Sequence, residues 1–318
     1  MGKLAFIFPG QASQYPGMGK DLAEKFPAAR AVFDEADRAL GFEISKLCFE
    51  GSEEALKQTE NTQPAILTVS VAVYRVLEER KALPDFVAGH SLGEYSALVA
   101  AGGLAFGDAV RLVRNRGKYM QEAVPPGEGA MAAILGISSA QVEEICKKVT
   151  EGGHVAAANL NSPEQTVISG HAAAVKRAVE EASASGAKRA VILPVSAPFH
   201  SELMMPAQKR LEADLHAAKF ENLRVPLMNN ADATLVTAAD EARDGLVRQV
   251  CLPVRWEQSV RELIAQGVSI FVEVGPGRVL TGLLRQIDRS VHCFNVEDEK
   301  SLGATLEKLM AARKETDS

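Results

Sequence analysis

The sequence has little cysteine, and what it has is scattered. Its 318 residues include only four cysteines, and no two of them have the spacing of a metal-binding or redox pair. Isolated cysteines of this kind behave as small buried apolar residues where thiols stay reduced. We therefore expect no metal site and a cytoplasmic protein, with separate thiols at Cys48, Cys146, Cys251 and Cys293.

Aromatic residues, basic charge and long apolar runs are also scarce. Aromatic residues make up 5% of the chain and the formal net charge is −6. This balance argues against nonspecific nucleic-acid binding, which needs a basic surface. Apolar runs such as Ala65–Val73 are too short to cross a bilayer, and the N-terminus lacks the pattern of a secretory signal. We expect no nucleic-acid partner and no membrane segment.

Apolar and small residues, by contrast, are plentiful. Hydrophobic residues make up 47% of the chain, which suits a closely packed core of strands and helices. Leu4–Phe8 predicts a first strand, and apolar periodicity predicts helices at Ala28–Leu40, Gln63–Lys81 and Phe106–Val124. After a break at residues 125–127, strands and helices follow in the order βαββαβ, which is that of a ferredoxin-like unit. We predict a main domain of residues 1–126 and 196–318, with residues 127–195 as an inserted subdomain.

One serine lies in a motif with chemical meaning. Residues 89–93 read Gly-His-Ser-Leu-Gly, between an apolar run that predicts a buried strand and a run that predicts a helix. This is the layout of a nucleophile elbow, in which a Cβ at either glycine would collide with the neighbouring chain. The motif alone is equally compatible with a plain turn whose serine caps the helix. The predicted fold class is α/β, with an α/β-hydrolase-like parallel-sheet core and an inserted ferredoxin-like small subdomain.

A nucleophilic serine needs a base, and the chain has six histidines. His90 is the neighbour of Ser91, but its side chain should lie on the other side of the turn, where a structural role is the better interpretation. His200 follows the point where the inserted subdomain rejoins the main domain, and a domain junction is a natural cleft. Spacing alone favours His200 only slightly, because a lone loop histidine is more often a surface residue.

Six stretches of the sequence together carry a resemblance to one family. They are Phe8–Gln14, Asn61–Ala65, Gly89–Glu94, Arg116–Gly117, Asn159–Pro163 and Pro198–His200. In order and approximate spacing they resemble the malonyl-CoA:acyl carrier protein transacylases, which load malonyl groups for bacterial type II fatty acid synthesis. The resemblance extends from about Ala5 to Met310 and favours the elbow interpretation of the serine motif.

The resemblance implies a role for each matching residue of the catalytic centre. Ser91 accepts the acyl group, and His200 takes its proton and later returns it to the leaving thiol. The backbone carbonyl of Gln249 orients His200 in place of a carboxylate. The backbone N–H groups of Gln11 and Leu92 form the oxyanion hole.

The resemblance also implies a substrate site around Arg116. Its guanidinium would bind the free carboxylate of the malonyl group through two parallel hydrogen bonds. Without the resemblance, the charged stretch of residues 111–118, Arg116 included, is better interpreted as a solvated helix face. With it, Arg116 is the matching position, and Arg111 and Arg114 are expected at the surface. The resemblance also implies further residues in or near the substrate pocket, mostly in supporting roles: Gln11, Gln63, Met131, Asn159, Asn161 and Phe199.

Two neighbours of the catalytic residues have expected roles of their own. Glu94 is interpreted as a structural ion-pair partner rather than as an acid catalyst. Phe199, directly before His200, resembles the malonyl-selective form of this loop, where a smaller serine tends to accompany methylmalonyl use.

The implied reaction transfers a malonyl group from malonyl-CoA to the phosphopantetheine thiol of acyl carrier protein through a malonyl-serine intermediate. Thioester, ester and thioester are close in energy, so we expect no cofactor. The carrier protein of this family is acidic, and so is this chain, which requires a local basic patch for docking. Arg278 and Arg285, seven apart on one predicted helix face, are candidates for that patch or for the phosphates of coenzyme A. We expect a monomer.

Three other functions compete with this hypothesis. A serine esterase or thioesterase has the same elbow, but it usually places an acidic residue between serine and histidine in chain order, and no such motif stands out here. A sensor of malonyl-CoA would not need a nucleophile and a base. An acyltransferase that serves a polyketide synthase in trans is hardly distinguishable by sequence.

Overall fold

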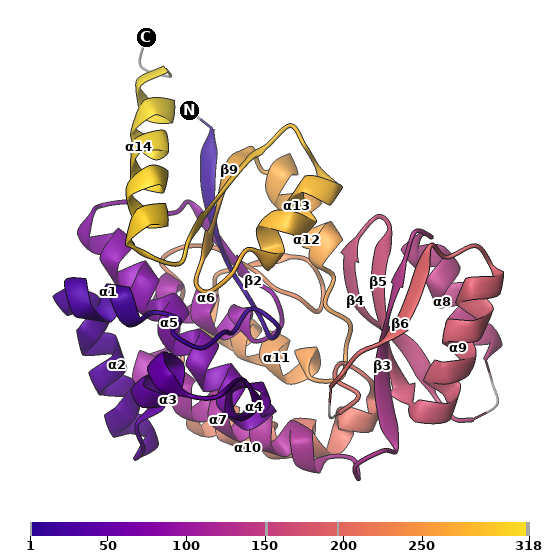
Figure 1. The fold of residues 1–318 in the computed structure, drawn as a ribbon. Helices are drawn as coiled ribbons and strands as arrows, with labels where there is room; N and C mark the ends of the chain where they lie inside the picture. Colours follow the sequence, from indigo (N-terminus) through magenta and orange to yellow (C-terminus); the bar gives the residue numbers. More distant parts are fainter. Residues whose placement is uncertain (1, 150–151, 196, 316–318) are drawn as a thin grey trace.

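Two β-sheets organise the chain, a large one that is mostly parallel and a small antiparallel one (Figure 1). The computed structural model describes residues 2–149, 152–195 and 197–315. In the large sheet the strand order is β10-β9-β1-β2-β7-β8, and only β7 and β8 pair antiparallel. The strands are β1 Lys3–Phe8, β2 Phe86–Gly89, β7 Leu227–Met228, β8 Leu235–Val236, β9 Val268–Val274 and β10 His292–Val296. The predicted α/β class with a parallel-sheet core is confirmed.

Strand β1 explains why helices cover both faces of this sheet. Its side chains alternate between two apolar clusters, with Phe6 and Phe8 in one and Ala5 and Ile7 in the other. A strand buried on both faces is typical of a parallel sheet between two helical layers. The first cluster includes α5 Thr59–Glu79, α6 Gly93–Ala101 and α7 Phe106–Glu122, and the second includes α12 Trp256–Ala265 and α13 Val279–Ile287.

The remaining helices of the main body extend these layers. Helix α2 packs on α5 and α7, and α10 packs on α7 and α11. The C-terminal helix α14 packs against β10 and lies beside the N-terminal strand in Figure 1. The bounds are α1 Lys20–Lys25, α2 Pro27–Leu40, α3 Ile44–Glu50, α4 Glu53–Lys57, the 3₁₀ helix Glu202–Met204, α10 Met205–Ala217, α11 Ala239–Gln249 and α14 Glu299–Glu315.

Helix α5 begins earlier than the sequence predicts, at Thr59, and it contains Pro64. Proline has no N–H, so it cannot donate to the carbonyl of Glu60 one turn earlier. The Nη1 of Arg114 takes that place and donates to the Glu60 carbonyl at 2.7 Å. Arg114 is therefore half-buried against α5 rather than a free surface residue, which corrects the sequence interpretation.

The small sheet has the predicted order of elements, βαββαβ. Its strands β3 Gly129–Leu135, β4 Val155–Ser162, β5 Gln165–His171 and β6 Arg189–Ile192 lie in the order β4-β5-β3-β6. Helices α8 Ser139–Lys148 and α9 Ala172–Ala184 cover one face, where they bury Ile134 and Ile168. Met131, from the other face, packs with the core of the main body. The ferredoxin-like arrangement is confirmed, and its helix-free face meets the main body.

The exact division into domains stays a prediction. The small sheet accounts for residues 129–192, inside the predicted insertion of residues 127–195. Residue 196, the predicted first residue of the returning main domain, lies outside the described residues. An isolated bridge between Asn159 and Val254 connects β4 to the main body.

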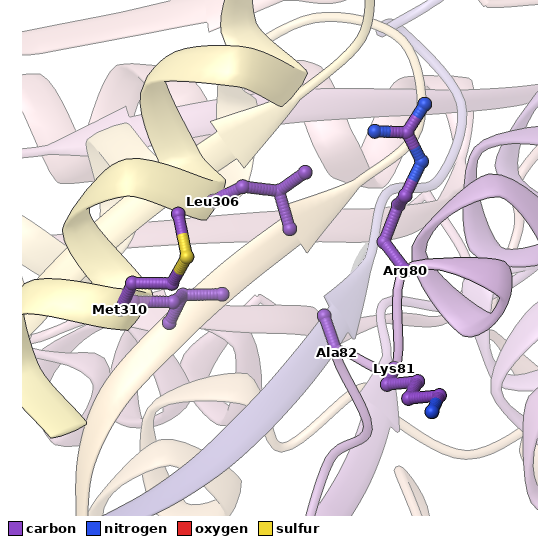
Figure 2. Close-up of a pocket in the computed structure, with 6 residues that line it drawn as sticks. Arg80, Lys81, Ala82, Leu306 and Met310 are labelled. Carbon is purple, nitrogen blue, oxygen red and sulfur yellow. The ribbon is translucent and has the colours of Figure 1, made fainter.

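Neither a membrane span nor a cluster of metal ligands is found in the described part of the chain. None of its helices is long and apolar enough to cross a bilayer, and no group of three or more His, Cys, Asp or Glu side chains there could hold a metal ion. A pocket of about 230 Å³ lies between the end of α5 and α14 (Figure 2). Its lining residues are Arg80, Lys81, Ala82, Leu306, Leu309 and Met310, none of which the sequence singled out.

Candidate active site

The turn between β2 and α6 is as tight as the sequence predicts. A Cβ at Gly89 would lie 1.9 Å from the carbonyl carbon of Gly93, and one at Gly93 would lie 2.1 Å from the carbonyl oxygen of Phe8. Ser91 has a φ of 52°, in the left-handed region that non-glycine residues rarely adopt. The surrounding packing holds this strained conformation, which places the serine at the start of α6.

His200 contacts the hydroxyl of Ser91. Its Nε2 lies 2.7 Å from Ser91 Oγ, and its Nδ1 lies 2.9 Å from the backbone carbonyl of Gln249. Because a carbonyl only accepts, Nδ1 carries the proton and Nε2 is free to accept one from the serine. Burial, and then the positive charge of Arg116, lower the pKa of His200 to about 3. The imidazole is thus neutral and able to act as a base.

The guanidinium of Arg116 lies next to the same hydroxyl. The side chain is only 1% exposed, and its Nη2 donates to Ser91 Oγ at 3.1 Å and to Gln249 Oε1 at 2.9 Å. Its Nη1 donates to Gln63 Oε1 at 2.7 Å. Burial lowers its pKa from the ordinary arginine value. Its described hydrogen-bond partners are two amides and the Ser91 hydroxyl, all uncharged, so a positive charge lies beside the serine without a carboxylate paired to it.

Gln11 lies in the loop after β1, which packs directly on the elbow. The N–H of His90 donates to the carbonyl of Phe8 at 3.0 Å, and a Cβ at Gly10 would lie 2.5 Å from the carbonyl oxygen of His90. Leu92 is fully buried at the start of α6. The backbone of Gln11 and that of Leu92 therefore lie on two segments in direct contact beside Ser91.

The other predicted pocket residues are distributed around this centre. Gln63 connects Arg116 to Gln11, since its Nε2 lies 3.5 Å from Gln11 Oε1. Met131 and Phe199 are both buried in the apolar core that joins the small sheet to the main body. Asn159 is buried on β4 without a described contact to Ser91 or His200. His90 turns away from the hydroxyl and bonds Asn161, as the sequence suggests.

Asn230 is a site residue that the sequence interpretation missed. Its Oδ1 accepts the N–H of Ser91 at 2.7 Å, and its Nδ2 donates to the carbonyl of Gly89 at 2.6 Å. It fixes both sides of the elbow. The sequence does contain a pattern that indicates this residue. Asn229 and Asn230 directly follow the strand at Leu227–Met228, and ligand-binding side chains gather at the carboxyl ends of parallel strands.

The expected role of Glu94 needs a correction. Its carboxylate is fully buried and accepts hydrogen bonds from the backbone N–H of Asn230 at 3.1 Å and from Gln249 Nε2 at 2.8 Å. Both partners are uncharged, so these contacts are not an ion pair. The sequence shows an acidic residue beside the elbow but does not show which distant segments approach it.

Comparison with known proteins supports one family for the whole chain. A family model for the acyl transferase domain matches residues 5–311. The malonyl CoA-acyl carrier protein transacylase of Bacillus subtilis is 50% identical over 97% of this chain and 98% of its own length.

Solved structures agree in fold over almost the full length. The transacylase of the same name from Clostridium perfringens has a TM-score of 0.96 and 41% identity, over 99% of this chain and all of its own. A malonyl-transacylase in complex with a type II PKS acyl-carrier protein has a TM-score of 0.94 and 46% identity, over 96% of this chain and 99% of its own. With a serine that contacts both a histidine and an arginine at the centre of this shared fold, the chain belongs to the malonyl CoA-acyl carrier protein transacylases of the acyl transferase family.

Proposed function

We propose that the protein transfers a malonyl group from malonyl-CoA to the phosphopantetheine thiol of acyl carrier protein in fatty acid biosynthesis. The observation that carries this proposal is the buried Arg116 guanidinium, 3.1 Å from Ser91 Oγ. A positive charge fixed beside the nucleophile favours an acyl group that ends in a carboxylate. The similarity to malonyl transacylases over nearly the whole chain supports the same substrate.

In the first half-reaction Ser91 Oγ attacks the thioester carbonyl, and its proton moves to His200 Nε2. The oxyanion is stabilised by the N–H groups of Gln11 and Leu92. The N–H of Ser91 itself is occupied by Asn230, which supports assigning this role to the next residue. The C–S bond then breaks, and His200 gives the proton to the departing coenzyme A thiolate.

The second half-reaction reverses these steps with another thiol. The phosphopantetheine thiol gives its proton to His200 and attacks the ester carbonyl of malonyl-Ser91. When the ester C–O bond breaks, Ser91 Oγ regains the proton. The proton passes only between serine, histidine and sulfur, so the two half-reactions return the enzyme to its starting state without a cofactor.

The esterase alternative is disfavoured by the partner of the base. His200 Nδ1 faces the carbonyl of Gln249, where serine hydrolases usually place a carboxylate. A polyketide synthase as the recipient is the remaining alternative, since one similar structure is a complex with such a carrier protein. One such complex does not outweigh the other relatives, whose names give acyl carrier protein as the recipient. Both kinds of carrier protein would present the same thiol.

A groove between α13, β10 and α14 is our candidate for carrier docking, and we call it the basic groove. It has a volume of about 590 Å³, and its four cationic side chains belong to Arg278, Arg285, Lys300 and Lys308. Arg278 pairs with Glu297 at 3.1 Å, and Tyr15, from the loop that also holds Gln11, bonds the same carboxylate at 3.2 Å. The groove is therefore connected to the loop beside Ser91 and suits an acidic protein.

We further propose that the protein works as a monomer in the cytoplasm, where its four thiols stay reduced. The residues Cys48, Cys146, Cys251 and Cys293 are free in the structure, which supports a reducing environment. We also propose residues 127–195 as the inserted subdomain and residues 1–126 and 196–318 as the catalytic domain. Light scattering of the purified protein measures its mass in solution and tests the monomer.

Intact mass spectrometry after incubation with malonyl-CoA tests the function. We expect one malonyl adduct, which added carrier protein removes. The Ser91→Ala variant should show no adduct, whereas Ser96→Ala, which removes a buried hydroxyl from the following helix α6, should behave like the wild type. Free malonate without carrier protein would point to a hydrolase, and an adduct on the Ser91→Ala variant would place the nucleophile elsewhere.

A further inference from the structure

Glu94 accepts hydrogen bonds from two residues that lead to different parts of the site. It lies in the first turn of α6, three residues after Ser91. Its Oε2 accepts from the N–H of Asn230, after β7, and from Nε2 of Gln249, at the end of α11. The carboxylate thus connects three segments that are far apart in sequence. It is fully buried, so these bonds do not compete with solvent.

The first connection leads to the nucleophile. When its backbone is held by Glu94, the side chain of Asn230 lies across the elbow, with Oδ1 on the N–H of Ser91 and Nδ2 on the carbonyl of Gly89. This pair of bonds fits only one orientation of the amide, because one partner donates and the other accepts. A shift of Asn230 would therefore release the strained φ of Ser91.

The second connection leads to the base and to the guanidinium. Gln249 uses its Nε2 on Glu94 and on the carbonyl of Ser91, its Oε1 on Arg116, and its backbone carbonyl on His200. A carboxylate accepts and a guanidinium only donates, so the two together fix which end of the Gln249 amide faces which neighbour. Without an acceptor at position 94, the amide is free to rotate, and Arg116 then loses one of its two amide partners.

We propose that Glu94 is a positioning residue of the transfer reaction, whose buried carboxylate holds Ser91 through Asn230 and holds Arg116 and His200 through Gln249. It touches no substrate. It acts by keeping nucleophile, base and guanidinium in one arrangement, and hydrogen-bond acceptance by Oε2 is the property that matters. This inference depends on the proposed site, with Ser91 as nucleophile and Arg116 as the carboxylate clamp.

Two substitutions of Glu94 separate hydrogen-bond acceptance from side-chain length. Oε1 of Glu94 is buried and has no hydrogen-bond partner among the described residues. A glutamine can therefore keep its carbonyl oxygen in the place of Oε2 and put its amide nitrogen in the place of Oε1. Glu94→Gln retains both acceptor bonds, whereas Glu94→Met keeps the length of the side chain and loses both.

A second buried carboxylate provides the matched control. Glu273, on β9, is also fully buried and accepts hydrogen bonds from the N–H groups of Leu280 and Thr281 at the start of α13. It has no described contact with Ser91, His200 or Arg116. Because both oxygens of Glu273 accept, Glu273→Gln loses one acceptor and Glu273→Met loses both, so the two variants disturb a buried carboxylate outside the site at least as strongly.

The test compares kcat/KM for malonyl-CoA and acetyl-CoA, because the ratio of the two does not depend on how much of a variant is folded. We expect Glu94→Met to lower kcat for malonyl transfer about 100-fold, as a misplaced catalytic group does. It should also lower the malonyl-to-acetyl ratio about tenfold, the size expected for one lost hydrogen bond to a charged group. Glu94→Gln should recover most of both, and both Glu273 variants should keep the wild-type ratio.

A substrate-independent measurement separates this inference from the proposed function. Phenylmethanesulfonyl fluoride sulfonylates an activated serine, and intact mass reports the rate. Glu94→Met should react at least tenfold more slowly than the wild type and Glu94→Gln at a similar rate, even if malonyl-CoA proves not to be the substrate. An unchanged ratio and an unchanged sulfonylation rate in Glu94→Met would overturn the positioning role. Loss in Glu94→Gln equal to that in Glu94→Met would overturn hydrogen-bond acceptance as its basis.

Discussion

The surroundings of Ser91 and the basic groove both carry positive charge, but it is buried and fixed in the first and exposed to solvent in the second. Around Ser91 a single buried guanidinium is held by uncharged amides, and the strained φ angles of Ser91 and His200 are fixed by packing. In the basic groove several cations are exposed on α13 and α14, and Arg278 is paired with a carboxylate. Buried charge in fixed geometry discriminates between similar acyl groups, whereas exposed charge mainly speeds the encounter with a partner.

We expect the largest effect on the buried side of this comparison, in the way the free energy of unfolding changes with pH because of Glu94. Burial raises the pKa of this carboxyl from 4.5 to about 7. The unfolded chain therefore loses the proton first, and stability falls as pH rises from 4.5 through 7, by about 3 kcal/mol in total.

Glu94→Gln carries no titrating group and should avoid this loss. We expect the difference in the free energy of unfolding between Glu94→Gln and the wild type to grow in favour of glutamine by about that amount between pH 4.5 and 8. Urea unfolding at several pH values measures it. The same charges remain around position 94 in both proteins, among them Arg116, Asp232 and Arg248. A difference independent of pH would mean that Glu94 is ionised at an ordinary pKa.

His200 should remain a neutral base well below pH 7. With an ordinary pKa of 6.5, its neutral fraction would fall about 25-fold between pH 7 and pH 5. Because burial and Arg116 lower the pKa to about 3, we expect the rate of Ser91 acylation to change less than threefold between pH 7 and 5. Rapid-quench measurement of acylation by malonyl-CoA tests this. A decline with a midpoint near 6.5 would show that the imidazole is more solvated than its 4% exposure indicates.

The smallest effect should come from the basic groove. Changing Arg278 and Arg285 to glutamate should slow transfer to carrier protein about tenfold at low ionic strength, and less as salt screens the charges. Acylation by malonyl-CoA should stay the same. The control places the same charge change at Arg30 and Arg38, two exposed arginines of α2. If the salt dependence of carrier transfer were equal in both double variants, docking would lie elsewhere.

Local patterns predicted much of the fold. The continuous apolar run Leu4–Phe8 predicted the first strand of the core, and the alternating elements after residue 127 predicted the ferredoxin-like unit. The short helices α1, α3 and α4, the strand β10 and the helix α14 were not predicted. Helices of five to seven residues have too few turns for a clear apolar period, and their positions depend on packing against α2 and α5.

In the active site, too, local motifs were predictable from the sequence, whereas contacts between distant segments were not. Ser91, His200, Arg116 and Gln249 were named from sequence, and the structure brings them into contact, although their roles remain proposals. The part played by Glu94 could not be predicted, because it depends on Asn230 and Gln249, which lie 136 and 155 residues away. Motifs report local chemistry, but hydrogen bonds between distant segments require the fold.

The selectivity of an Arg116→Ala variant tests the central claim most directly. Malonyl and acetyl thioesters differ by one carboxylate, and truncation of one partner of a buried charge pair costs about 2–5 kcal/mol, or roughly 30-fold to a few thousand-fold. We expect kcat/KM for malonyl-CoA to fall by that factor and that for acetyl-CoA to change little or rise. Arg116→Lys should recover only part, and Arg114→Ala, on the same helix, should leave the ratio unchanged. If malonyl and acetyl transfer fell together in Arg116→Ala, the carboxylate clamp would lie elsewhere and the account would be contradicted.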